Sequence, residues 1–279
     1  MTSALSNFDR QWKLRSTEAD APVFIFSAGW RSGSTLLQRL ICSSEEVLVW
    51  GEAYARCGLI QKLSDSTKSL TVAYPHSGHF PGLQASDLKD KWIANVFPSP
   101  ADMKSTYRSA IDAFLYRPVL REGYARFGLK EVRLDADHGR FLQWIYPDAR
   151  FFCLVRNPWD AWQSAKGLEL YASWPDTPIN TAQAFAEHWL KMVESFADWR
   201  EESVFFFRYE DLIGHPNSVR AVQAHAQLDT IDPMVLQKVV GASQSKVPLT
   251  PDEVATIEQI AGSAARQLGY GPLGGLQAA

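Results

Sequence analysis

The stretch from Phe24 to Leu37 constrains the fold of this chain more than any other. A short apolar run leads into the small-residue loop 27–33 (SAGWRSG), and a helical pattern begins directly afterwards at Ser34. This order predicts a strand, a tight turn and a helix N-terminus in succession. Free backbone N–H groups and the positive end of the helix dipole make such a turn a binding site for anions.

The cation of this loop is not where nucleoside-triphosphate-binding loops carry theirs. In those loops the last glycine is followed by Lys and then by Ser or Thr. Here Gly33 is followed by Ser34 and Thr35, and the cation, Arg31, stands two residues before the glycine. The loop therefore predicts a phosphate-containing ligand of a different kind. Taken alone, the pattern is equally that of an ordinary turn before a helix.

Five short apolar runs predict strands. They are near-continuous rather than alternating, as expected for strands that are covered on both faces. Helical patterns lie between or after them, at Ser34–Ser43 and Thr181–Arg200, and a last helix begins at the capping box 250–253 (TPDE) and stops before Gly269. The predicted strands are Val23–Ser27, Glu46–Val49, Ala125–Leu129, Phe151–Val155 and Val204–Arg208.

This alternation indicates an α/β fold of the P-loop nucleotide-binding type, with a central parallel sheet of about five strands flanked by helices. With 279 residues, we expect an N-terminal extension over 1–20 and one domain over 21–279. The stretch 60–124 fits the alternation poorly. We expect it to be a helical and loop insertion that lies near an acceptor site, where a molecule other than the phosphate-containing ligand would bind.

Composition narrows the class of partner. A formal net charge of −3 and a pI near 6.1 argue against a nucleic-acid-binding protein. No apolar run reaches membrane-spanning length, and the N-terminus lacks the pattern of a signal peptide. Three cysteines without metal spacing predict reduced thiols, a cytoplasmic protein and no metal site. The oligomeric state stays open, a homodimer included.

Polar side chains follow each predicted strand, where ligands bind in open α/β sheets. Besides the loop, they are Glu52, Lys130, Arg156 and Tyr209. Each has an ordinary alternative: a solvated carboxylate, a paired lysine, a surface arginine beside a helix start, and a packed tyrosine. Their common placement at one edge of the sheet favours a site for an anionic, phosphorylated ligand with a base nearby.

These residues resemble the sulfotransferases that use 3′-phosphoadenosine 5′-phosphosulfate (PAPS). The segment 30–35 (WRSGST) is similar to that family's 5′-phosphosulfate loop, and 150–158 (RFFCLVRNP) with Ser164 is similar to its 3′-phosphate site. Asn157-Pro158 stands where the family commonly has Asp-Gly or Asp-Pro. Within the family the resemblance is closest to the tyrosylprotein and Golgi-type branch, here as a soluble protein, because Gly51-Glu52 and Lys130 match its active-site spacing.

The resemblance implies a role for each residue. Glu52 would be the catalytic base, with Arg31 and Lys130 stabilising charge on the transferring group. Arg31 through Thr35, that is Arg31, Ser32, Gly33, Ser34 and Thr35, would hold the 5′-phosphosulfate. Arg156 and Ser164 would hold the 3′-phosphate, and Tyr209, Ser243 and Lys246 would lie against the nucleotide. The product would be 3′,5′-ADP (PAP), and the family needs no divalent metal.

Two other functions stay open at this point. One is a P-loop kinase or other NTPase, which would turn over ATP with Mg²⁺. The other is a non-catalytic nucleotide-binding protein.

If the chain is a sulfotransferase, the acceptor would be a hydroxyl on a sugar, phenol, peptide, lipid or specialised metabolite. Aromatic residues in 50–54, 74–80 and 170–174 are candidates for its binding walls, or else pack within the insertion.

Overall fold

A computed structural model describes the chain over residues 21–52, 57–69, 80–81, 87–90, 92, 94, 96–97, 100–166, 179–215, 217–238 and 247–272. Its centre is a five-stranded parallel sheet in the order β2-β5-β1-β6-β7. All five predicted strands are confirmed, with ends that differ by two residues at most. They are β1 (Val23–Ser27), β2 (Val47–Trp50), β5 (Arg126–Glu131), β6 (Arg150–Val155) and β7 (Val204–Arg208).

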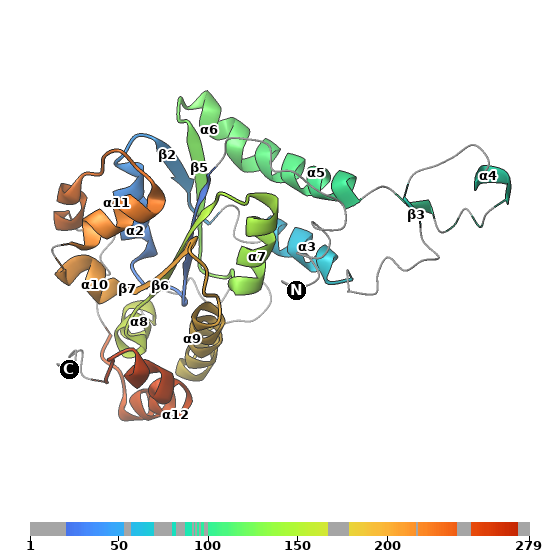
Figure 1. Cartoon of the computed structure of the whole chain (residues 1–279). Coiled ribbons are helices and arrows are strands. Elements are labelled where there is room, and N and C mark those ends of the chain that lie inside the picture. The colour runs from blue at the N-terminus through green and yellow to red at the C-terminus, as the bar shows by residue number, and fades with distance from the viewer. Residues whose placement is uncertain are drawn as a thin grey trace.

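Helices cover both faces of this sheet, as the continuous apolar strands require (Figure 1). On one face lie α2 (Ser34–Cys42), α10 (Tyr209–Gly214) and α11 (Ser218–Ala226), followed by the 3₁₀ turn η5 (Pro233–Gln237). The other face is covered by α7 (Ala136–Ile145), α8 (Pro158–Ala165), α9 (Ala182–Ala197) and α12 (Pro251–Gln267).

The sequence specifies the ends of several of these helices. Thr250 and Glu253 form the expected capping box at the start of α12, and Gly269 follows its end with a φ of 77°. Asp135 caps α7 in the same reciprocal way with His138. Asn157 caps α8 by accepting the backbone N–H groups of Trp159 and Asp160.

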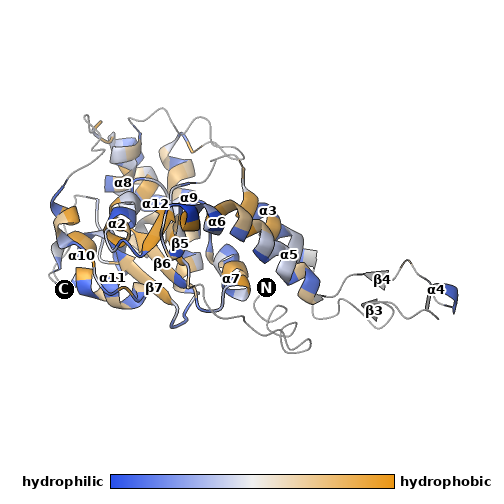
Figure 2. Cartoon of the chain, turned by 90° about the horizontal axis from the view of Figure 1, so that it is seen from above, coloured by the Kyte–Doolittle hydropathy of each residue, from blue (hydrophilic) through white to orange (hydrophobic). Residues whose placement is uncertain are grey.

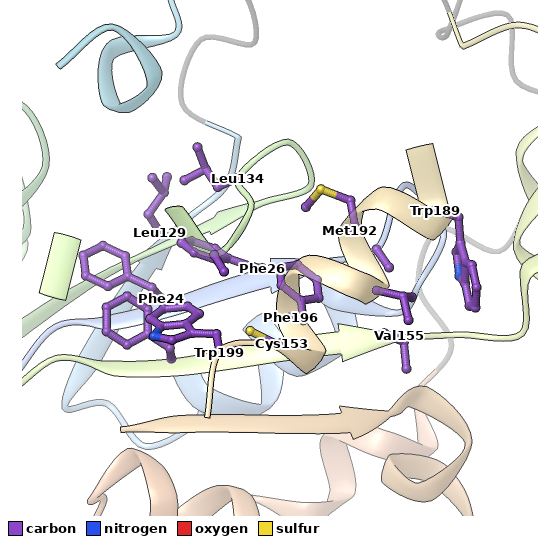
Figure 3. Close-up of a cluster of buried hydrophobic side chains, with 14 of the residues drawn as sticks. Phe24, Phe26, Leu129, Leu134, Cys153, Val155, Trp189, Met192, Phe196 and Trp199 are labelled. Carbon is purple, nitrogen blue, oxygen red and sulfur yellow. The ribbon is translucent and has the colours of Figure 1, made fainter. Parts of the chain in front are cut away.

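The larger core is rich in aromatic side chains. Phe24 of β1 stacks on Phe151 of β6 with ring centroids 5.3 Å apart, and the ring of Trp199 lies 4.7 Å from that of Phe151. Met192 and Phe196 of α9 lie over the same strands (Figure 3). The strands are strongly hydrophobic and are enclosed by helices with hydrophilic outer sides (Figure 2). Cys153 is wholly buried here, as expected of a core thiol.

The described parts of the 60–124 stretch are helical near the sheet. They comprise α3 (Leu59–Ser66), η1 (Thr67–Ser69), α5 (Pro100–Ile111), the π-helical η3 (Asp112–Tyr116) and α6 (Arg117–Arg121). Ile60, Ile111 and Leu115 are buried in the main core, so both ends of the insertion help to build the domain. Farther out, β3 (Phe80–Pro81) pairs with β4 (Val96–Phe97), with α4 (Asp87–Asp90) between them, away from the main sheet (Figure 1).

The order of the strands places a topological switch point between β1 and β6. The chain leaves β1 toward β2 on one side of the sheet, and it leaves β6 toward β7 on the other. Ligands of open α/β sheets bind at such a switch point, outside the carboxyl ends of the strands. The loop after β1 and the corner after β6 therefore meet where a ligand is expected.

Candidate active site

The loop after β1 has the backbone of an anion site. Gly29, Arg31 and Gly33 have φ values of 84°, 62° and 85°, while Trp30 and Ser32 between them do not have positive φ. This alternation turns successive N–H groups toward one concave side. No side chain caps the N-terminus of α2 and its first turn carries no acidic residue, so the helix dipole there is not neutralised by the described residues.

Side chains fix the shape of this loop. The Ser32 hydroxyl donates to the carbonyl oxygens of Gly29 at 2.9 Å and Ala28 at 3.2 Å. Ser32 is wholly buried, Ser34 is 5% exposed, and the side chain of Thr35 is exposed. Ser32 therefore holds the turn from inside, and Thr35 presents the hydroxyl that is accessible from outside.

Tyr209, one of the residues named from the sequence, lies against the loop. A Cβ on Gly33 would lie 2.1 Å from Cδ2 of Tyr209 and 2.4 Å from Cε2. The position thus needs glycine twice, once for its φ of 85° and once for this contact. The ring closes directly on the start of α2.

Arg156 joins the loop to Tyr209. Its Nη1 donates to the carbonyl oxygen of Arg31 at 2.7 Å, and its guanidinium carbon lies 4.8 Å from the centroid of the Tyr209 ring. Arg31 in turn donates from Nε to the Ser164 hydroxyl at 3.0 Å. The structure therefore brings Arg31, Arg156, Ser164 and Tyr209 together as one group at the switch point between β1 and β6.

Lys130 and Glu52 form a second pair at the same edge of the sheet. Lys130 Nζ lies 2.6 Å from Glu52 Oε1, with the two side chains 9% and 25% exposed. Lys130 comes from the end of β5 and Glu52 from just beyond β2, neighbouring parallel strands. A sparsely hydrated ammonium–carboxylate pair is a strong hydrogen bond, and it places one group of each sign next to the other at this edge.

Two contacts hold the end of β2 that carries Glu52. The Trp50 indole donates to the carbonyl oxygen of Leu115 at 2.8 Å, and the Gln38 amide donates to that of Val49 at 2.7 Å. Leu115 lies in the π-helical segment η3. Such segments recur at functional sites because they release carbonyl groups from the regular helical pattern.

A small cavity lies between α3, η3 and the end of β5. It is lined by apolar side chains, among them Ile60, Phe114 and Leu129, and by the carboxylate of Glu131. Burial raises the pKa of Glu131 above its usual range, and the guanidinium of Arg133, which forms an ion pair with it, opposes that rise. The cavity is thus lined by both apolar and polar residues, with Gln61 and the buried acidic group of Glu131 among them.

Sequence reasoning missed several residues around the site. His188 of α9 lies with its ring centroid 5.3 Å from that of Trp30, and its Nε2 lies 3.3 Å from the carbonyl oxygen of Val132. Burial lowers the pKa of His188 to about 4, so the ring is neutral at pH 7. Nothing in the local pattern of α9 marks this histidine, because its partners come from other segments.

Some predicted residues lie outside the described part of the chain. They are Ser243 and Lys246, and most of the aromatic candidates in 50–54, 74–80 and 170–174. Within the described residues, no group of three or more His, Cys, Asp or Glu side chains is arranged to hold a metal ion. No helix in that same part of the chain is long and apolar enough to cross a membrane.

Comparison with known proteins decides the family. A sequence model of the sulfotransferase family matches residues 22–232. The chain belongs to the sulfotransferase family. The matched range contains the loop after β1, Glu52, Lys130, Arg156 and Tyr209, and a search of curated proteins found no match.

Three solved structures that are similar to this chain are sulfotransferases or sulfotransferase domains. The sulfotransferase domain from the curacin biosynthetic pathway has a TM-score of 0.50 and 17% identity, over 91% of this chain and 99% of that one. The sulfotransferase domain of the Synechococcus PCC 7002 olefin synthase has a TM-score of 0.44 and 17% identity, covering 90% and 98%. A sulfotransferase from Alicyclobacillus acidocaldarius has a TM-score of 0.43 and 16% identity, over 90% of this chain and 100% of that one. The first likeness supports the fold and no more.

Proposed function

We propose that this sulfotransferase moves the sulfuryl group of PAPS to a hydroxyl of an acceptor, giving a sulfate ester and 3′,5′-ADP. One observation carries the proposal. An anion-binding loop, an arginine stacked on a tyrosine, and a lysine–glutamate pair all lie at the carboxyl edge of one sheet. Family membership supports the reaction class, and the geometry supports a nucleotide donor beside a general base.

The donor would bind at the switch point between β1 and β6. The N–H groups of the loop and of the start of α2 suit the 5′-phosphosulfate, and Arg156 with Ser164 suits the 3′-phosphate. The Nε of Arg156 is buried and has no hydrogen-bond partner among the described residues. Buried donors in proteins are rarely left without an acceptor, and a phosphate oxygen would supply one. Ser243 and Lys246 remain proposed contacts from the sequence alone.

The reaction would use the Lys130–Glu52 pair. The acceptor oxygen attacks sulfur, its proton passes to Glu52, and the bond between sulfur and the bridging oxygen of the 5′-phosphate breaks. Lys130 would turn from Glu52 toward that bridging oxygen, which frees the carboxylate as base, while Arg31 stabilises the sulfuryl oxygens. Little covalent work is needed from the protein, so positioning and electrostatics dominate, as in phosphoryl transfer.

The finer assignments rest on the sequence. The tyrosylprotein and Golgi-type branch and a cytoplasmic location are predictions from motif spacing and composition, and the oligomeric state is open, a homodimer included. The acceptor class is open among sugars, phenols, peptides, lipids and specialised metabolites. The insertion as one wall of the acceptor site is likewise a proposal from the sequence.

The experiment is an acceptor screen with radiolabelled PAPS and mass detection of an added sulfuryl group. We expect label transfer to at least one hydroxyl acceptor with release of 3′,5′-ADP, in the presence of a chelator. Mg²⁺-dependent ATP hydrolysis, with no label transfer from PAPS to any class, would instead establish the NTPase alternative. Tight binding of 3′,5′-ADP without transfer to any acceptor class would favour the non-catalytic one.

A further inference from the structure

Three segments of the chain meet at the carboxylate of Glu210. Its Oε1 accepts the backbone N–H of Asn157 at 3.1 Å, and its Oε2 accepts the hydroxyl of Tyr270 at 2.8 Å. Glu210 lies in the first turn of α10, next to Tyr209. Asn157 follows β6, and Tyr270 lies past the end of α12. One side chain therefore bridges the β6–α8 corner, the β7–α10 corner and the C-terminal corner 268–271.

The peptide unit between Arg156 and Asn157 is held at both ends. Its carbonyl oxygen, that of Arg156, accepts the indole N–H of Trp189 at 3.0 Å, and its N–H donates to Glu210. A peptide unit is planar and rigid, so these two bonds set the position from which the Arg156 side chain extends. The guanidinium at the other end contacts the loop after β1 and the ring of Tyr209.

The C-terminal corner is fixed by further contacts. The Asn157 amide donates to the carbonyl oxygen of Gly271 at 2.9 Å, and Arg208 Nη1 donates to that of Leu268 at 2.9 Å. Tyr270 is 4% exposed. Burial, and then Glu210, raise the pKa of its hydroxyl well above the usual range, so it remains a donor. Asn157 suits this corner better than the aspartate common in the family, because a carboxylate has no N–H for Gly271.

We propose that Tyr270 and Glu210 are positioning residues for Arg156, so that the C-terminal corner sets the affinity of the site for a 3′-phosphate. The inference rests on the proposed function, in which Arg156 holds that phosphate. It goes beyond it by assigning a part in donor recognition to a corner far along the chain from both phosphate-binding segments.

The test compares two ligands by calorimetry, 3′,5′-ADP and 5′-ADP, which lacks the 3′-phosphate. The Kd for 5′-ADP divided by the Kd for 3′,5′-ADP is the ligand ratio, and it measures the preference for that phosphate. Tyr270→Phe removes one hydroxyl and keeps the ring. We expect Kd for 3′,5′-ADP to rise about 3- to 10-fold, the effect of losing about one hydrogen bond, while Kd for 5′-ADP changes less than about twofold.

Tyr146→Phe is the matched control. Tyr146 is another buried tyrosine, and its hydroxyl donates to Asp112 Oδ1 at 2.6 Å. This variant should lose stability in the same way as Tyr270→Phe, with the ligand ratio unchanged. A change in the ratio confined to Tyr270→Phe therefore separates positioning of Arg156 from general weakening of the fold.

Two variants of Glu210 complete the test. Glu210→Ala should lower the ratio at least as much as Tyr270→Phe, and Glu210→Gln should restore most of it, because glutamine still accepts the Asn157 N–H. Wild-type ratios in Tyr270→Phe and Glu210→Ala, at reduced stability, would overturn the inference and leave the proposed function intact. A wild-type protein that does not distinguish the two ligands would overturn both.

Discussion

Replacing Gly33 by alanine should damage the donor site in two separable ways. Gly33 has a φ of 85°, and the left-handed region costs a residue with a Cβ about 1–2 kcal/mol. The new Cβ would also lie 2.1 Å from the Tyr209 ring, and overpacking of this kind costs about 1–3 kcal/mol. The variant should therefore lose about 2–5 kcal/mol of unfolding free energy.

Gly123→Ala is the control for the cost of placing alanine at a positive φ. Gly123 has a φ of 87°, and a Cβ there would have no atom within 4 Å. Urea unfolding of this variant should show the backbone strain alone, about 1–2 kcal/mol. The difference between the two alanine variants then measures the contact between Gly33 and Tyr209.

Nucleotide binding gives the second readout. The new methyl group would push the Tyr209 ring away from the guanidinium of Arg156, so that their cation–π contact is lost. The loss of such a contact corresponds to about a 2- to 30-fold decrease in affinity. Calorimetry with 3′,5′-ADP should show that loss in Gly33→Ala and wild-type affinity in Gly123→Ala. The reasoning is refuted if Gly33→Ala is as stable as Gly123→Ala and binds 3′,5′-ADP like the wild type.

Three further variants test other parts of the account. Glu52→Gln should lower kcat by about 10²–10⁴-fold with Kd for 3′,5′-ADP unchanged, and wild-type turnover would remove Glu52 from the mechanism. Asn157→Asp should lower the unfolding free energy by about 1–3 kcal/mol, because Gly271 loses its donor beside Glu210; unchanged urea unfolding would contradict that contact. Burial lowers the pKa of His188 from 6.5 to about 4, so the unfolded chain takes up this proton first and stability falls by up to about 3 kcal/mol as the pH drops from 6.5 to 4. In His188→Gln, the unfolding free energy measured with urea should fall less between pH 6.5 and 4 than in the wild type. An equal fall in both proteins would contradict the assignment of this pH dependence to His188.

The sequence predicted the elements that depend on local chemistry. Continuous apolar runs located the five strands to within two residues, and the capping box and Gly269 located α12. The position of polar residues at strand ends predicted that Glu52 and Lys130 would share one edge of the sheet. The structure places them there, 2.6 Å apart, and this ion pair is also the ordinary alternative that the sequence offered for Lys130. Parallel strands carry such information because their carboxyl ends meet at one edge.

Contacts between distant segments were beyond the sequence. The stacking of Tyr209 on Gly33, the bond from Arg31 to Ser164 and the three-way junction at Glu210 depend on how whole helices dock on the sheet. The π-helical segment whose Leu115 carbonyl oxygen accepts the Trp50 indole N–H could not be predicted either, because its sequence is an ordinary helical pattern. The packing of Ile60, Ile111 and Leu115 from the 60–124 stretch into the main core was likewise not evident from the sequence.

The central claim is that this edge of the sheet holds a nucleotide with a 3′-phosphate as sulfuryl donor. Calorimetric titration of the wild-type protein with 3′,5′-ADP and, separately, with ATP and Mg²⁺ tests it without knowledge of the acceptor. The account predicts that 3′,5′-ADP binds more tightly by at least about tenfold, the effect of one charge-assisted phosphate contact. Tighter binding of ATP with Mg²⁺, or equal binding of the two nucleotides, would contradict it.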